Sequence, residues 1–313
     1  MKDKSKNPIY AIVGPTASGK TEIGVELALR LGNGEIINCD SVQIYKEIQI
    51  ATAKPTAEEM KGVPHHLIGY VSPEINYTAD DWANDASEKI REIESRENIP
   101  ILVGGTGFYL RTLREPLVET PKTDKKLRER FNKIRKKKGA EHLYKILQRV
   151  DKKSADKNFP KDYPRVQRAL EVYFQTGERF SELQPKRKKP PEFAERIKVF
   201  VLKPPRDILY ERINERAKRH FRNGLAEEVK MLLEKGLSDK KNALGSHGYR
   251  RVCEYLDGER TIESAIEKTQ QDVRNYAKRQ FSWFRREKDV TWLEGFGNEK
   301  ATQEKLWEML ELK

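Results

Sequence analysis

The sequence predicts an α/β fold, in which a P-loop core with a parallel sheet flanked by helices carries an all-helical insertion. Short apolar runs alternate with amphipathic segments up to about residue 116 and again after residue 193, as in parallel strands joined by helical crossovers. The segment 117–193 between them has helical periodicity and no apolar run typical of a strand. A glycine-rich turn at residues 14–21 joins the first apolar run to the first amphipathic segment.

The individual elements follow from local pattern. Apolar runs of four to seven residues predict buried strands at 9–13, 35–39, 66–71, 100–105, 196–202 and 290–293, with 66–71 the weakest. Thr78 stands three residues before Asp81, which predicts a capped helix start. Further helices are expected at 20–31, 205–223, 225–235 and from 261 to about 287, and three or four lie within 123–176.

Length and composition indicate a folded protein with a large core and a smaller unit. Residues 1–116 and 194–313 are expected to form the α/β catalytic core and 117–193 the insertion. No apolar stretch approaches the ~18 residues of a membrane span, and the first residues lack the apolar centre of a signal peptide. Two cysteines are too few for a disulfide framework or a four-cysteine zinc site. A cytoplasmic monomer with reduced thiols and no membrane partner is expected.

Positive charge is concentrated in the expected insertion. The chain has a formal net charge of +13, and residues 117–193 alone hold 23 Lys and Arg against 11 Asp and Glu, whereas the remainder is near neutral. A near-neutral body with one basic segment suits the binding of a polyanion such as nucleic acid. The alternative is a solvated lysine-rich surface without a partner.

The glycine-rich turn fits the pattern G-x-x-x-x-G-K-[ST], with Gly14 first and Thr21 last. In this pattern backbone N–H groups and the following helix N-terminus bind phosphate oxygens. The lysine, here Lys20, neutralises the far phosphate, and the Thr21 hydroxyl can coordinate Mg²⁺. The sequence therefore predicts a phosphate site with Mg²⁺ as cofactor, formed by Gly14, Pro15, Thr16, Ala17, Ser18, Gly19, Lys20 and Thr21.

Asp40 is the candidate catalytic residue because it follows the expected strand 35–39. In a parallel sheet the carboxyl ends of the strands meet at the ligand crevice, so Asp40 is expected across from the phosphate loop as a general base. The alternative is an Asp that only caps a turn. Nucleotide hydrolases usually add a metal-binding carboxylate after another strand, but "ILVGGTG" ends in Gly104 and Gly105. Two chemistries remain open: phosphoryl transfer by a kinase, or attack on carbon with diphosphate leaving.

Seven motifs occur together in one order along nearly the whole chain, from about Ile9 to Leu293. They are "GPTASGKT", "DSVQIYKEIQIATAKP", "GVPHHLIGY", "LVGGTGFYL", "RVQRALEVYFQTG", "HGYR" and "YAKRQFSWFR". The set closely resembles the bacterial type of tRNA dimethylallyltransferase (tRNA isopentenyltransferase). The resemblance implies transfer of a dimethylallyl group from dimethylallyl diphosphate to N6 of the adenosine 3′-adjacent to the tRNA anticodon. The expected partners are therefore dimethylallyl diphosphate and the anticodon stem-loop of tRNA.

The resemblance also implies roles for individual residues. Residues 14–21 and Arg216 are expected to bind the departing diphosphate, and Asp40 to accept the proton of N6. The flipped base is expected at Asp40, Ser41, Val42 and Gln43. The remaining tRNA contacts that it implies are Thr106, Arg128, Pro164, Arg165, Val166, Gln167, Arg168, Gly245, Ser246, His247, Gly248, Tyr249 and Arg250. For Arg216 the alternative is a surface ion pair, although no acidic residue lies three or four positions away.

Other functions remain as alternatives. They are a P-loop kinase of a small acceptor, a prenyltransferase acting on free AMP, and an RNA-binding module with a vestigial loop. The basic segment argues against free AMP, which needs no such surface. The aromatic side chains of residues 275–287 are expected in the core, and the alternative is that they stack on RNA beside the basic residues among them. The adjacent His65 and His66 are expected on opposite faces of a strand, without a metal site.

Overall fold

The computed structural model describes residues 7–238 and 243–312. The chain forms two compact units, which are described separately. The core unit runs to Arg114 and resumes at Pro191, and the helical unit spans Glu115–Pro190. The insertion was expected at 117–193, so its predicted start is two residues too late and its predicted end three residues too late. Among the described residues, no helix is both long and apolar enough to cross a membrane.

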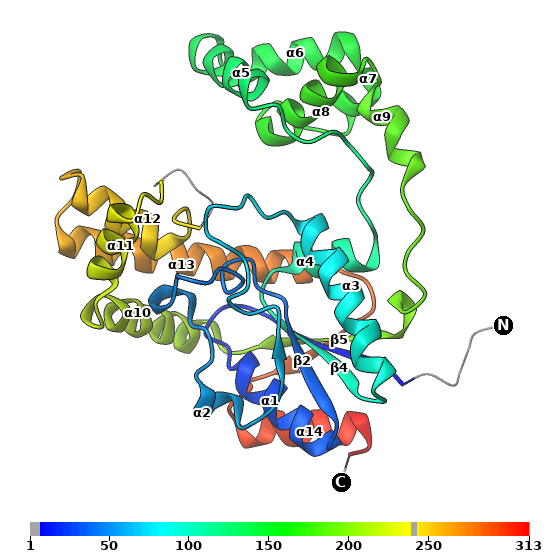
Figure 1. Ribbon diagram of the computed structural model, residues 1–313, viewed down its shortest axis with the longest axis vertical. Helices are drawn as coiled ribbons and strands as arrows, with labels where there is room; N and C mark the ends of the chain where they lie inside the picture. Colours follow the sequence, from blue (N-terminus) through cyan, green and yellow to red (C-terminus); the bar gives the residue numbers. More distant parts are fainter. Residues whose placement is uncertain (1–6, 239–242, 313) are drawn as a thin grey trace. The chain divides into compact units, whose positions relative to one another are not determined.

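The core unit contains a parallel sheet with helices on both faces (Figure 1). Its strands are β1 (Ile9–Val13), β2 (Gly34–Asn38), β3 (His65–His66), β4 (Ile99–Gly104), β5 (Ile197–Lys203) and β6 (Val290–Glu294). Its helices are α1 (Lys20–Leu31), α2 (Ala57–Met60), α3 (Ala79–Ser95), α4 (Gly107–Arg114), α10 (Arg206–Arg222), α11 (Leu225–Glu234), α12 (His247–Leu256), α13 (Ile262–Phe284) and α14 (Lys300–Leu310). Short 3₁₀ turns lie at Ile50–Thr52 and Ala194–Arg196.

The strands pair in the order β3-β2-β4-β1-β5-β6, and every pairing is parallel. All six carboxyl ends therefore lie at one edge of the sheet. Two apolar clusters cover its faces: alternate strand residues pack against α1 and α14 on one side, and against α3, α4 and the α11–α13 segment on the other. The expected doubly covered parallel sheet is confirmed, and its carboxyl edge is the position where such sheets bind ligands.

Helix α3 shows how sequence, cap and packing agree. The Thr78 side chain accepts a hydrogen bond from the N–H of Asp81, whose carboxylate accepts one from the Thr78 N–H, so the predicted capping box is present. The buried face of the helix includes Trp82, whose ring stacks on Tyr109 with centroids 4.9 Å apart. The Trp82 indole N–H donates to the carbonyl of Asn38 at 2.9 Å. This bond fixes the end of β2, immediately before the segment that carries Asp40.

The predicted strand at 66–71 is wrong in length, since only His65–His66 joins the sheet. Leu67 and Gly69 have positive φ angles of 59° and 56°, which interrupt an extended chain. The opposite orientation of the two histidines is confirmed by their register, because His66 contacts the Glu35 carboxylate at 2.6 Å and His65 does not. Helices α2, α4, α12 and α14 were not expected from the sequence pattern.

The helical unit is built from α5 (Lys125–Lys138), α6 (Ala140–Val150), α7 (Lys152–Asp156), α8 (Tyr163–Thr176) and α9 (Phe180–Leu183). A 3₁₀ turn follows at Gln184–Lys186. The four helices within 123–176 agree with the sequence pattern. Phe131, Leu143, Leu147, Val166 and Leu170 form its apolar centre, separate from the clusters of the core unit.

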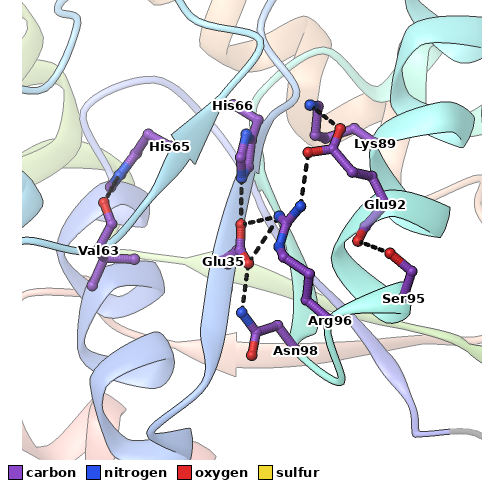
Figure 2. A network of polar contacts seen from close by, with 9 residues as sticks. All are labelled: Glu35, Val63, His65, His66, Lys89, Glu92, Ser95, Arg96 and Asn98. Carbon is purple, nitrogen blue, oxygen red and sulfur yellow. Dashed lines mark hydrogen bonds and ion pairs between the residues drawn. The ribbon is translucent and has the colours of Figure 1, made fainter.

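A buried carboxylate fastens the β3 edge of the sheet (Figure 2). Glu35 on β2 accepts hydrogen bonds from Asn98 and from His66, both at 2.6 Å. Its two carboxylate oxygens also accept from one guanidinium nitrogen of Arg96, at 3.1 and 2.9 Å. Arg96 also pairs with the exposed Glu92 at 2.8 Å. Burial alone would raise the pKa of Glu35, but the hydrogen bonds from Asn98, His66 and Arg96 outweigh it and lower this pKa below its ordinary value of 4.5.

We expect Glu35→Gln to lower the free energy of unfolding by ~3 kcal/mol at pH 7, because Arg96 and His66 lose the charged acceptor that is buried between them. A carboxylate with a lowered pKa stabilises the fold above its unfolded-state pKa and loses this effect as the pH falls through its folded pKa. The variant should therefore lose less stability on acidification below about pH 4.5 than the parent. Urea unfolding between pH 3 and 7 measures both effects.

The matched control is Glu92→Gln, which removes the exposed partner of the same arginine. It should change stability far less than Glu35→Gln does, because solvent screens this exposed pair. Equal effects of the two substitutions would contradict a specific role for the buried carboxylate.

Candidate active site

The phosphate loop connects β1 to α1 in a backbone shape that requires glycine at both ends. Gly14 has φ +147°, and a Cβ there would lie 3.0 Å from the carbonyl oxygen of Leu202. Gly19 has φ +82°, and its Cβ would lie 2.8 Å from the backbone nitrogen of Asn298. No side chain caps the N-terminus of α1, so its first N–H groups remain available to an anion. The predicted loop thus has the geometry of an anion site.

Lys20 lies folded over this loop. Its ammonium donates to the carbonyl of Pro15 at 2.6 Å, and the buried Ser18 hydroxyl donates to the same oxygen at 2.8 Å. Burial lowers the pKa of Lys20 to about 8, although the Asp40 carboxylate opposes the shift and Arg216 adds to it. Two cations thus share one small region, and an anion bound in the loop would stabilise both.

Arg216 reaches the loop from α10. Its guanidinium donates to the Thr16 hydroxyl, and burial followed by repulsion from Arg219 lowers its pKa to about 10. Neither an acidic partner nor a surface ion pair is found for Arg216 among the described residues, so the alternative of a simple surface pair fails. Arg216 therefore lies beside the phosphate loop, and its contact with a diphosphate stays a prediction.

Gln280 on α13 was missed by the sequence analysis. Its carboxamide oxygen accepts the Thr16 N–H at 2.8 Å, and its amide donates to the carbonyl of Gly105 at 2.8 Å. The buried side chain therefore bridges the phosphate loop and the end of β4. The motif "YAKRQFSWFR" contained this residue, but only the tertiary structure shows its two partners.

Asp40 caps a turn, and its role as a general base stays a prediction. One carboxylate oxygen accepts the N–H of Val42 at 2.9 Å and that of Gln43 at 3.4 Å, as in a turn-capping Asp. The other oxygen has no hydrogen-bond partner among the described residues and is available to a substrate. The Gln43 amide donates to the carbonyls of Thr52 and Ala53, which holds the neighbouring loop against the site.

The glycine pair after β4 replaces the carboxylate found in nucleotide hydrolases for a steric reason. A Cβ at Gly104 would lie 2.1 Å from the carbonyl oxygen of Cys39, and one at Gly105 would lie 2.3 Å from the Gln280 amide. The ends of β2 and β4 therefore approach more closely than any side chain allows. Thr106 follows directly, and its hydroxyl accepts the N–H of Ser41 at 3.0 Å.

Two cavities meet at these groups. The first, of about 380 Å³, is lined by the phosphate loop, by apolar residues such as Ile36 and Val103, and by Arg216 and Gln280. The second, of about 610 Å³, has polar and aromatic walls. Four residues line both cavities: Thr16, Asp40, Thr52 and Arg216. Asp40 thus borders an anion site on one side and a second, larger chamber on the other.

The predicted segment 245–250 contributes its first four residues to the second cavity. Gly245, Ser246, His247 and Gly248 line it together with Ser41, Val42 and Thr106. Tyr249 is buried away from it, and its hydroxyl donates to Glu228 at 3.0 Å. Glu228 also accepts the N–H groups of Gln49 and Ile50 at 2.6 and 2.9 Å. Glu228, absent from the sequence-based site, therefore anchors the wall of the chamber. The exposed Arg250 pairs with Glu254 at 3.4 Å.

In the helical unit the predicted residues divide into exposed and buried sets. Pro164 and Arg165 are exposed at the start of α8, whereas Val166 and Gln167 are buried in the unit's centre. The side chains of the buried pair cannot reach an RNA surface in this conformation. A direct contact would therefore have to come from their exposed neighbours.

Arg128 and Arg168 are largely occupied by contacts within the same unit. Arg128 makes a two-fold ion pair at 2.8 Å with Glu171, which is fully buried. Arg168 donates to the hydroxyl of Thr120 and the carbonyl of Pro121, both at 2.7 Å. These arginines stabilise the helical unit, and only their remaining donors are available to a ligand.

The residues present fit a Mg²⁺ ion carried by a diphosphate. The Thr21 hydroxyl lines the first cavity and has no hydrogen-bond partner among the described residues. Mg²⁺ keeps several waters and is commonly held by substrate phosphates and one or two protein oxygens. The described residues contain no group of three or more His, Cys, Asp or Glu side chains that could hold a metal by themselves.

Comparisons with known proteins agree with this geometry. The family model described as IPP transferase matches residues 43–287. The chain is 44% identical over 293 residues to a tRNA dimethylallyltransferase of Koribacter versatilis, covering 94% of each chain. It is 42% identical over 294 residues to the tRNA dimethylallyltransferase of Geobacter metallireducens, again covering 94% of each chain.

Solved structures give the same result. The full-length tRNA isopentenylpyrophosphate transferase of Bacillus halodurans superposes with a TM-score of 0.71 and 36% identity, covering 98% of this chain and 96% of that one. A eukaryotic dimethylallyltransferase acting on tRNA superposes with a TM-score of 0.77 and 30% identity, covering 97% of this chain and 76% of the other. With the phosphate loop, the carboxylate and the fold in agreement, this chain belongs to the IPP transferase family.

Proposed function

We propose that this protein transfers a dimethylallyl group from dimethylallyl diphosphate to N6 of the adenosine 3′-adjacent to the anticodon of tRNA, releasing diphosphate. Relatives that align over 94% of their length carry the name tRNA dimethylallyltransferase. The observation that carries the proposal is that the phosphate loop and Asp40 border the same two cavities. The first would hold the donor and the second the acceptor base.

The donor side is suited to stabilising a leaving group. Adenine N6 is a weak nucleophile because its lone pair is delocalised into the ring, so the reaction depends on the departure of diphosphate. The N-terminus of α1, Lys20 and Arg216 supply positive charge where negative charge develops. Mg²⁺ on the Thr21 hydroxyl would supply further charge to the diphosphate. The apolar wall at Ile36 and Val103 would accommodate the hydrocarbon part of the donor.

The acceptor side is suited to a base that has left its stack. An adenosine in an anticodon loop must flip out before its N6 can reach the donor carbon, at a cost of a few kcal/mol. The unpartnered oxygen of Asp40 would accept an N6 proton while the other oxygen stays fixed by Val42. Thr106 and Ser41, which are hydrogen-bonded to one another, would orient the base edge. All these groups belong to one chain, and we propose that a monomer is sufficient.

The kinase, free-AMP and non-enzymatic alternatives have no observation in their favour. The relatives are named for tRNA prenyl transfer. The excess of 12 positive charges over residues 117–193 supports a polyanionic partner.

Asp40→Asn tests the proposed base while keeping the turn, because an Asn oxygen can still accept the Val42 N–H. We expect turnover of dimethylallyl diphosphate on an anticodon stem-loop to fall by ~10²-fold or more, with stem-loop affinity nearly unchanged. Single-turnover rates and filter binding measure the two quantities. Unchanged turnover in this variant would remove Asp40 from the chemistry, and a parent enzyme inactive with both substrates would contradict the proposed function.

Arg165→Glu tests the helical unit as a tRNA contact without disturbing its interior, since this side chain is 71% exposed and pairs only with Asp162 at 3.4 Å. We expect the KM for tRNA to rise ~5-fold and the slope of log affinity against log salt to decrease by about 0.7–0.9. Lys186→Glu, a charge reversal of another exposed and singly paired cation in the same unit, is the control. Identical slopes in both variants would mean generic attraction rather than a contact at Arg165.

A further inference from the structure

Phe108 is an exposed aromatic side chain at the rim of the second cavity. It lies in the first turn of α4, and 44% of its surface is accessible. Nine large apolar side chains among the described residues are at least 38% exposed, and Phe108 alone among them lines a cavity that Asp40 also lines. Its neighbours Tyr109, Leu110 and Leu113 form the buried face of α4, so the ring is not part of that packing.

The ring is rigidly mounted. Trp283 on α13 contacts it edge to face, with centroids 5.9 Å apart and planes at 76°, and Figure 1 shows α4 alongside α13. The Arg111 guanidinium lies over the Trp283 ring, 4.2 Å from the ring centroid, and pairs with Glu287 at 2.5 Å. Trp283 also lies so close to Gly107 that a Cβ there would be 2.3 Å from its ring. Phe108 therefore loses little conformational entropy when a ligand covers it.

Hydrogen bonds connect the start of α4, which carries Phe108, to the segment that carries Asp40. Thr106, two residues before Phe108, accepts the N–H of Ser41 and donates its own N–H to the carbonyl of Cys39 at 3.1 Å. These bonds hold the start of α4 against the two residues on either side of Asp40. The position of the Phe108 ring is consequently fixed relative to the carboxylate and to the base that this carboxylate would accept.

On the proposed function, the acceptor presents an unpaired ring surface at this rim. When the target adenosine leaves the anticodon-loop stack, the base next to it loses one stacking partner. Proteins that bind single-stranded RNA commonly replace such a partner with an aromatic side chain, and the contact is tolerant of base identity. We propose that Phe108 is a stacking platform for the nucleobase that flanks the flipped adenosine, and so a positioning residue for the acceptor.

A binding cycle tests this inference without relying on turnover. The parent and Phe108→Leu are each titrated with an anticodon stem-loop and with two analogues, abasic immediately 5′ or 3′ of the target adenosine. Leucine keeps apolar bulk but has no ring face. For the parent, we expect one abasic analogue to bind ~10-fold more weakly than the intact stem-loop. For Phe108→Leu, the same two ligands should differ in affinity by less than 2-fold. Phe108→Trp should restore the parent's discrimination.

Met309→Ala is the matched control because Met309 is also 44% exposed and lines neither cavity. It should behave as the parent throughout. If the parent binds both abasic analogues as well as the intact stem-loop, or if Phe108→Leu discriminates as strongly as the parent, the platform is refuted. Prenyl transfer to the intact stem-loop by the same samples separates this failure from failure of the proposed function: active parent enzyme with no discrimination overturns only the role of Phe108.

Discussion

The whole site depends on the close approach of the ends of β2 and β4. The carbonyl of Cys39 occupies the space that a side chain on Gly104 would need, and Gln280 occupies the space beside Gly105. Gln280 then carries this contact to the phosphate loop through the Thr16 N–H. The position of Asp40 relative to the loop is therefore set by backbone and amide contacts, which hold it more firmly than flexible side chains could. A carboxylate after β4 would be incompatible with this packing.

The positive charges beside the phosphate loop favour an anionic ligand at this site. Burial lowers the pKa of both Lys20 and Arg216; repulsion from Arg216 adds to the shift of Lys20, and repulsion from Arg219 adds to that of Arg216. Asp40 is the acidic group that opposes both shifts. Binding an anion in the loop removes that repulsion, and a group that gains negative charge during the reaction gains most. The site is thus better suited to holding a departing diphosphate than to holding a neutral ligand. On the proposed function, the nearby carboxylate oxygen of Asp40 that has no partner among the described residues would serve the acceptor side of the same reaction.

Features that rest on local sequence could be predicted. The phosphate loop needs only its glycines and the strand and helix around it, and the α3 capping box needs only Thr78 and Asp81. Asp40 could be placed from the general geometry of parallel sheets, although its turn-capping bond to Val42 shows that the two interpretations were not exclusive. The shortened β3 could not be predicted, because positive φ at Leu67 has no clear sequence signal.

Features that rest on contacts between distant residues were missed. Gln280 and Glu228 act on partners more than 170 positions away in the chain, and no local pattern reveals such partners. Motif matching also could not separate Arg165 from Gln167. The two residues are close in sequence on the same helix, but the first is exposed and the second is buried. Phe108 lay within a quoted motif, but its exposure at the cavity rim appears only once α4 and α13 are packed together.

Transfer of label from two competing donors is the most direct test of the central claim that the phosphate loop holds a leaving diphosphate. Dimethylallyl diphosphate labelled in its hydrocarbon part and ATP labelled at its γ-phosphate are offered together, with and without an anticodon stem-loop. The account predicts that hydrocarbon label enters the RNA only when all components are present, and that γ-phosphate reaches no acceptor. Transfer or RNA-stimulated release of γ-phosphate without any prenylated RNA would contradict it.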